Sequence, residues 1–303
     1  MSTDQNPNAI TTQQNTALAA ANVPEWLRNA PDDDSIKMMS QYVQPPRLKI
    51  VQGQSSIEMK QQFGESSVIL VPDNRIVTPP IDYKTGGKEA QSEYMRVIPV
   101  FKYVEFTKMN PNGVAPFIVE RSLDENSDLA KKCRQFPVER RKVQHPDFPN
   151  DKQKLIKYCE VHNFVCIVWH PDGLADRPVI INFHSGAFFM GSNWCRLCMM
   201  HHKIVRYWGQ VFEVNVSARK KDQNNWYAFN VRSAIDPTTG FVEFVTDPGW
   251  FQRLQELHDE LYAQWKDGAL QVNYDDDEQT VDPNVIDTTA TASNGGTQTV
   301  NRF

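Results

Sequence analysis

The sequence lacks the short glycine-rich motifs of several enzyme classes. It contains no G-x-x-x-x-G-K-S/T loop, which would cradle a nucleotide phosphate, and no G-x-G-x-x-G fingerprint for a dinucleotide. His170 and His184 invite comparison with hydrolases, but no G-x-S-x-G elbow accompanies them. We therefore expect neither enzymatic activity nor a cofactor.

Cysteines and long apolar runs are also scarce. The five cysteines are an odd number and lack the spacing of a disulfide framework. No apolar run approaches the roughly 20 residues that span a bilayer, and residues 1–24 lack the basic and then apolar pattern of a secretory signal. We expect a soluble protein of a reducing compartment, with no membrane partner.

One compact group of cysteine and histidine residues is a candidate metal site. Cys195, Cys198 and His202 would share one face of a helix, and zinc prefers thiolate and imidazole ligands. A structural zinc site normally takes a second ligand pair from elsewhere, and the sequence places none. Cysteines packed in a core are the commoner explanation, so we expect no metal.

Positive charge is scarce in the chain as a whole, which has a net charge of −5, but it is concentrated locally. Residues 1–44 carry −3 and residues 271–303 carry −5, which leaves +3 for residues 45–270. Within this body, residues 201–232 alone carry +4. A local positive field of this kind can attract a phosphate backbone.

Composition also divides the chain into three parts. Residues 1–44 begin with an Asn/Gln/Thr/Ala-rich stretch and predict a flexible arm with short docked pieces, residues 45–270 predict the folded body, and residues 271–303 predict a disordered tail. The acidic cluster of this tail consists of Asp275, Asp276, Asp277 and Glu278. Such a cluster could bind Mg²⁺, but catalytic carboxylates are held apart on rigid elements, so a solvated segment is favoured.

The clearest strand pattern lies between Val211 and Val231. Apolar and polar residues alternate in 211–218 and again in 226–231, which predicts a hairpin with a basic, polar loop at 219–225. Trp226 and Tyr227 would lie on opposite faces, and Trp226 is the favoured exposed platform because Tyr227 shares its face with Phe229. Cations at a hairpin tip beside strand aromatics suit the binding of a nucleic-acid strand.

The remaining pattern is that of a β-rich α+β body. A long strand is expected at Arg96–Phe106, and helices are expected at Asp151–Tyr158, Asn193–Trp208 and Gly249–Lys266. The candidate nucleic-acid-binding residues are Lys102, Tyr103, Lys203, Arg206, Arg219, Lys220, Lys221, Trp226 and Tyr227.

This layout, a strand-rich body with a basic and aromatic hairpin, one helix and an acidic tail, resembles the single-stranded DNA-binding proteins of tailed bacteriophages. The segments that carry the resemblance are PPRLKIVQGQSS, FIVERSLDENSDLAKK, KLIKYCEVHNFVCIV and WYAFNV. The resemblance implies an OB-like β-barrel core with several peripheral helices, and a basic, aromatic groove that binds single-stranded DNA without strong sequence preference.

The same resemblance implies a role in phage DNA replication and recombination, in the cytoplasm of the infected bacterial host. It also implies that the acidic tail, through Asp275–Glu278, recruits replication proteins such as a polymerase or a helicase/primase. Apart from the resemblance, a tethered polyanion near a cationic groove is expected to compete with DNA for that groove. An alternative is a virion structural protein or a host-interaction protein without nucleic-acid activity, because β-rich bodies and polar arms are equally natural there. An enzyme acting on nucleic acid is the third possibility.

Overall fold

The architecture comes from a computed structural model. It describes residues 45–53, 55–71, 73–82, 91–111, 117–136, 138–151, 154–170, 173–174, 178–184, 187–221 and 224–270. All of these belong to one compact unit, Gln44–Phe303. The predicted N-terminal arm, residues 1–44, and the predicted acidic tail, residues 271–303, lie outside the described residues.

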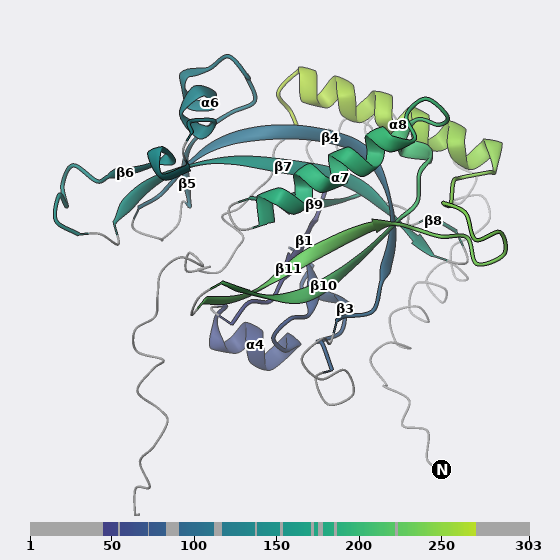
Figure 1. Cartoon of the computed structure of the whole chain (residues 1–303), viewed down its shortest axis with the longest axis horizontal. Helices are drawn as coiled ribbons and strands as arrows, with labels where there is room; N and C mark the ends of the chain where they lie inside the picture. The colour runs from purple at the N-terminus through teal and green to yellow at the C-terminus, as the bar shows by residue number, and fades with distance from the viewer. Residues whose placement is uncertain are drawn as a thin grey trace, which may run out of the picture. The chain divides into compact units, whose positions relative to one another are not determined.

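Strands dominate the described part of the chain (Figure 1). The strands are β1 (Arg47–Ile50), β2 (Val68–Val71), β3 (Arg75–Thr78), β4 (Met95–Met109), β5 (Ile118–Ser122), β6 (Lys142–Gln144), β7 (Leu155–His170), β8 (Gly173–Leu174), β9 (Val179–Phe183), β10 (Phe212–Lys221) and β11 (Asn224–Ser233). The helices are α4 (Ile57–Phe63), α6 (Asp128–Cys133), α7 (Phe188–Met200) and α8 (Pro248–Lys266), with 3₁₀ turns η2 (Val138–Arg141) and η4 (Tyr207–Gly209). The predicted β-rich α+β class is confirmed.

The sheet is built around the long antiparallel pair β4 and β7. Their register runs from Arg96 opposite Trp169 to Lys108 opposite Tyr158. It shifts at Pro99, which cannot donate a ladder hydrogen bond and is therefore tolerated at a bulge. From this pair the strand order is β11-β10-β4-β7-β9-β1-β2-β3, while β5, β6 and β8 pair beside the main path.

The sheet is mixed and does not close into a barrel within the described residues. β1 pairs in parallel with β9 and antiparallel with β2, whereas β10 and β11 form an antiparallel hairpin. The path ends at β11 and at β3, which do not pair with each other. The expected OB-like β-barrel is therefore not confirmed. Gln52 lies just after β1 in the chain. Its side-chain amide forms hydrogen bonds with the main chain of Tyr227 in β11 and so connects the two strands.

Each face of the sheet carries its own apolar core. On one face α7 contributes the fully buried Trp194, which stacks on Phe164 of β7 with ring centroids 4.2 Å apart. On the other face α8 packs through Leu254 and Leu261. Fully burying a large apolar side chain contributes roughly 1.5–3 kcal/mol, so the two helices hold the sheet between them.

The helix α8 confirms the prediction for Gly249–Lys266. Asp247 caps it, since its carboxylate accepts the backbone N–H of Trp250 at 2.8 Å, and Pro248 occupies the first turn where its missing N–H costs nothing. Leucines at helical spacing then bury one stripe.

Two other predicted helices differ from the structure. Residues 155–158 belong to β7 rather than to a helix, because Tyr158 packs against α6 and pairs with Lys108. The helix expected at Asn193–Trp208 begins five residues earlier and ends at Met200. It includes Gly191, whose absent side chain permits the approach to β7 and β9: a Cβ there would lie 2.9 Å from Cβ of Phe183.

Candidate nucleic-acid interface

The hairpin β10–β11 is longer than the sequence predicts. Pairing continues outward through Arg219 opposite Trp226 and Lys220 opposite Asn225. The basic residues predicted for a loop are thus held in strand β10 as far as Lys221. Because opposed residues share a face, Arg219 and Trp226 lie together on one surface of the hairpin.

Arg219 links the hairpin to the start of α7. Its guanidinium donates a hydrogen bond to the side-chain oxygen of Asn230 and lies 3.5 Å from the sulfur of Met190. The Arg219 side chain is half-buried and held in place, whereas Lys220 is exposed. Because Lys220 is the next residue of β10, it lies on the opposite face of the hairpin from Arg219. The two cations can therefore bind phosphates only on either side of the hairpin end.

The two aromatic residues lie on the faces predicted for them. Tyr227 packs against the core together with Phe229 and Val231. Trp226 lies on the other face. It is half-buried like Tyr227, and its buried indole nitrogen makes no hydrogen bond within the described part of the chain. Because Tyr227 packs against the core, Trp226 is the one of the two whose ring faces away from that core.

Lys203 and Arg206 form a second basic group, separate from the hairpin tip. Both are exposed in the turns that follow α7. Arg219 contacts Met190 near the start of α7, whereas Lys203 and Arg206 follow its end, and the helix rises about 15 Å from Met190 to Met200 at 1.5 Å per residue. The structure therefore does not place the predicted cations in one cluster but near the two ends of α7.

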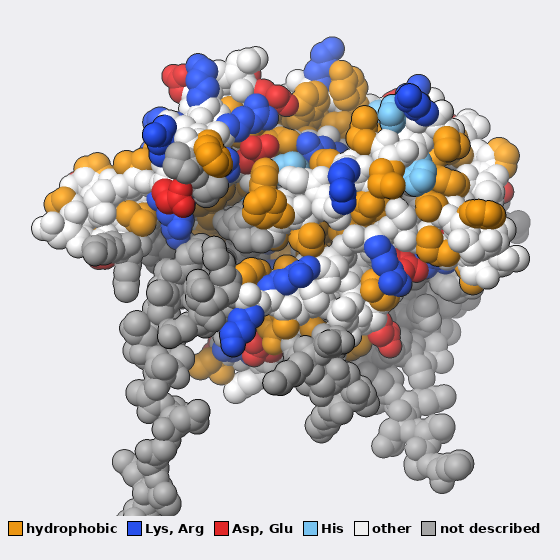
Figure 2. Space-filling view, viewed as in Figure 1, with side chains coloured by type: hydrophobic (Ala, Val, Ile, Leu, Met, Phe, Trp, Pro, Cys, Tyr) orange, Lys and Arg blue, Asp and Glu red, His pale blue; other side chains and the backbone are white. Residues whose placement is uncertain are grey.

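Between the two basic groups, the outer face of α7 carries exposed apolar residues that the sequence analysis did not predict. Phe189 is 78% exposed, and Met199 and Met200 are also largely exposed, as is Ile204 in the turn after the helix. Arg196 projects from the same face and bonds the side chain of Asn193 at 2.9 Å. The i, i+7, i+11 spacing of Phe189, Arg196 and Met200 would have predicted this face, had the helix been started at Phe188. Figure 2 shows Lys and Arg side chains interspersed with hydrophobic ones on the side of the unit that carries α7 and the hairpin.

The structure separates the remaining two candidates, Lys102 and Tyr103, which are adjacent on β4. Lys102 is half-buried and lies opposite Phe164, on the face that α7 covers. Tyr103 is 3% exposed and packs into the core under α8, 6.2 Å from the ring of Phe101. Strand alternation explains the split, and it removes Tyr103 from the interface.

Glu213, near the start of β10, forms an ion pair with a residue of the neighbouring strand. Glu213 on β10 is opposite Arg232 on β11, and the guanidinium binds its carboxylate at 2.6 and 2.7 Å. The same guanidinium lies 3.9 Å above the ring of Tyr94. Glu213 therefore subtracts little from the positive field of Arg219 and Lys220.

The candidate metal ligands do not converge. Cys195 faces the ring of His162, Cys198 is buried, and the ring of His202 donates a hydrogen bond to the carbonyl of Met199 at 2.6 Å. No group of three or more His, Cys, Asp or Glu side chains among the described residues could hold a metal ion.

No family model matches the chain, and neither the curated proteins nor the solved structures include a match to it. In the part of the chain that the structure describes, no helix is long and apolar enough to cross a membrane.

Proposed function

We propose that the chain binds single-stranded DNA without strong sequence preference, through the surface formed by the outer face of α7 and the β10–β11 hairpin. The observation that carries this proposal is that cations lie near both ends of α7, while exposed apolar side chains lie on the helix between them. The proposed role is in phage DNA replication and recombination in the host cytoplasm, with no turnover of the strand.

The chemistry of this surface suits an unpaired strand better than a duplex. Arg219, Lys220 and Lys203 would neutralise phosphates, and this contribution does not depend on base identity. Trp226 and Phe189 present rings on which any base can stack, because every base has a π face. A duplex keeps its bases stacked on each other and could use only the cations.

The OB-like interpretation of the fold belongs to the same proposal. Strands β11, β10, β7, β9 and β1 contribute to the apolar core on which α7 packs, and the Gln52 side chain, just after β1, bonds the Tyr227 main chain of β11. We propose that this arrangement is an open variant of an OB-like barrel. The acidic tail, residues 271–303, would then recruit replication proteins or compete with the strand.

Intrinsic fluorescence tests the proposal directly, because the chain has seven tryptophans. Titration with poly-dT should quench the emission, and the quenching should be lost at high salt. A double-stranded oligonucleotide of equal length should bind more weakly at the same salt. Unchanged fluorescence together with unchanged anisotropy of a labelled poly-dT would refute it, and would favour the virion or host-interaction alternative.

A further inference from the structure

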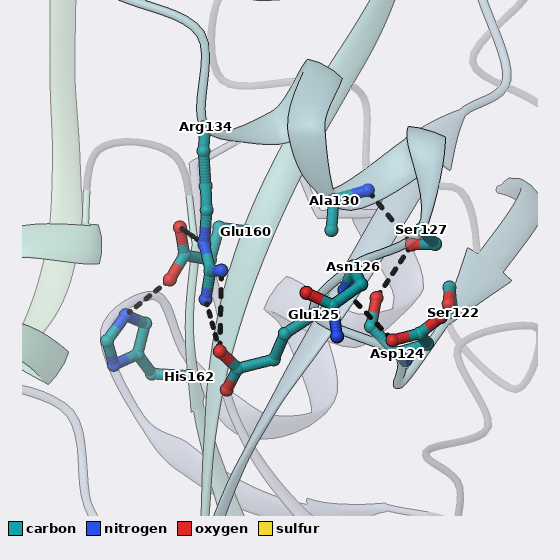
Figure 3. Close-up of polar contacts among 9 residues, drawn as sticks. All are labelled: Ser122, Asp124, Glu125, Asn126, Ser127, Ala130, Arg134, Glu160 and His162. Carbon is teal, nitrogen blue, oxygen red and sulfur yellow. Dashed lines mark hydrogen bonds and ion pairs between the residues drawn. The ribbon is translucent and has the colours of Figure 1, made fainter.

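A thiol on α7 lies next to an imidazole of β7, and that imidazole lies next to a carboxylate of the same strand. The Cys195 sulfur is 3.8 Å from Nδ1 of His162, and Nε2 of the same ring is 3.6 Å from Oε1 of Glu160. Figure 3 shows the ring of His162 directed toward Glu160, which in turn faces the guanidinium of Arg134. Each ring nitrogen thus faces a different partner.

The fold explains why these groups meet. Glu160 and His162 are alternate residues of β7 and so point to the same face. Gly191 lets α7 approach that face, since a Cβ there would lie only 3.0 Å from Cβ of His162. The ring of Phe188 covers the imidazole edge-on at 4.8 Å, which leaves His162 only 7% exposed.

The carboxylate remains ionised in this setting. The hydrogen-bonding contact with His162, together with the positive charge of Arg134, holds the pKa of Glu160 below its ordinary value despite partial burial. At 3.6 Å the contact is longer than an ordinary hydrogen bond. An ionised carboxylate beside Nε2 favours the tautomer that carries its proton there, which leaves the Nδ1 lone pair toward the sulfur.

The thiol needs such a base. Burial raises the pKa of Cys195, and the positive charge of Lys102 opposes this only in part. At neutral pH the group is therefore a thiol rather than a thiolate, and an adjacent base that takes its proton converts it into a nucleophile.

We propose that Cys195 is a base-assisted reactive thiol whose partners are small anionic disulfides. His162 takes the thiol proton on Nδ1 while the sulfur attacks one sulfur of the disulfide. One mixed disulfide bond forms and the original disulfide bond breaks. The proton passes from His162 to the released thiolate or, where that thiolate is too weak a base, to solvent. The ammonium of Lys102 on β4 favours an anionic partner. This inference does not depend on the proposed binding of DNA.

The chain supplies its own controls. Cys133, Cys166 and Cys198 are buried, and burial raises the pKa of each of these thiols. Cys159 is half-buried like Cys195, but it lies on the β7 strand itself. Accessibility alone would make Cys159 and Cys195 react alike, whereas assistance by His162 applies to Cys195.

Dithiobis(nitrobenzoate), a coloured anionic disulfide, tests the proposal on the folded full-length chain. We expect one equivalent to react rapidly, to be lost in Cys195→Ser and to be retained in Cys159→Ser. His162→Gln should slow it by about a hundredfold, the usual size of general-base assistance. Glu160→Gln should slow it less. A fast equivalent that survives in Cys195→Ser, or a wild-type rate in His162→Gln, would overturn the proposal.

If His162→Gln unfolds, all five thiols of that variant will react. In that case the dependence of the wild-type reaction rate on pH tests the proposal. Assistance by His162 predicts that part of the rate does not depend on free thiolate, so the rate should rise much less than tenfold per pH unit below the thiol range. A rate that keeps rising tenfold per pH unit into the thiol range would mean that free thiolate reacts without assistance, and would refute the proposal. The charged groups that face the pair are Glu160, Arg134 and Lys102.

Discussion

The side-chain amide of Gln52 forms two hydrogen bonds with the main chain of Tyr227, each 2.9 Å long. Its nitrogen donates to the Tyr227 carbonyl, and its oxygen accepts the Tyr227 N–H. Tyr227 is opposite Ala218 on β10, and the bonds to Gln52 use the other edge of β11. One amide thus satisfies groups that a neighbouring strand would otherwise pair.

Gln52→Ala should destabilise the protein by about 1–3 kcal/mol, because it leaves a strand N–H and a carbonyl without their partner. The melting temperature by circular dichroism measures this loss. Gln61→Ala on the exposed face of α4 is the matched control and should change stability by less than about 0.5 kcal/mol. Equal melting temperatures for the two variants would show that water replaces the amide at no cost.

Replacing Arg219, Lys220 and Lys221 by Ala should weaken the salt dependence of single-strand binding. Each neutralised phosphate contributes about −0.7 to the slope of log affinity against log salt, so the slope should become less steep by about 2. Anisotropy of a labelled oligo-dT across a salt series measures it. The triple variant of Lys131, Lys132 and Lys266, on α6 and α8, removes the same charge elsewhere. If both triple variants change the slope equally, the strand does not follow the hairpin.

Trp226→Ala should reduce single-strand affinity by roughly 1–3 kcal/mol, the worth of one stacked base, with little change in melting temperature. Tyr227→Ala should do the opposite, since its ring packs against the core with Phe229. Tyr262→Ala, an exposed aromatic on α8, should affect neither property. Loss of folding in Trp226→Ala with retained folding in Tyr227→Ala would reverse the face assignment.

Truncation after Tyr274 should raise the affinity for single strands at low salt. The removed segment carries six carboxylates, and a tethered polyanion competes with DNA at an effective concentration that can reach about a millimolar. The gain should shrink as salt rises, because the Debye length is about 10 Å at 0.1 M. Equal affinities at every salt concentration would mean that the tail does not compete for the surface.

Sequence reasoning succeeded where a pattern is long and local. The helix α8 has leucines at helical spacing over many turns, and Asp247 with Pro248 marks its start. The faces of Trp226 and Tyr227 followed from strand alternation alone. These features depend on neighbouring residues, so one sequence is enough to predict them.

The features that failed or were missed depend on distant partners. Residues 151–158, DKQKLIKY, mix charged and apolar side chains as a surface helix does, and only pairing with β6 and β4 makes residues 155–158 a strand. The contact between Cys195 and His162 joins residues 33 positions apart and requires the close approach at Gly191. The expected barrel came from a resemblance in layout, and layout does not specify which strands pair.

The parallel pairing of β1 with β9 sets an order for folding during synthesis. Arg47 is opposite Ile180, and the Ile180 N–H donates to the carbonyl of Pro46 at 2.8 Å. A ribosome adds about 5–20 residues per second, so β1 and β2 emerge on the order of ten seconds before the strand that covers the other edge of β1. During that interval the β1 edge is an open template for strands of other chains. The nascent protein therefore depends on whatever shields this edge until β9 arrives, and slow translation between the two strands should increase misassembly.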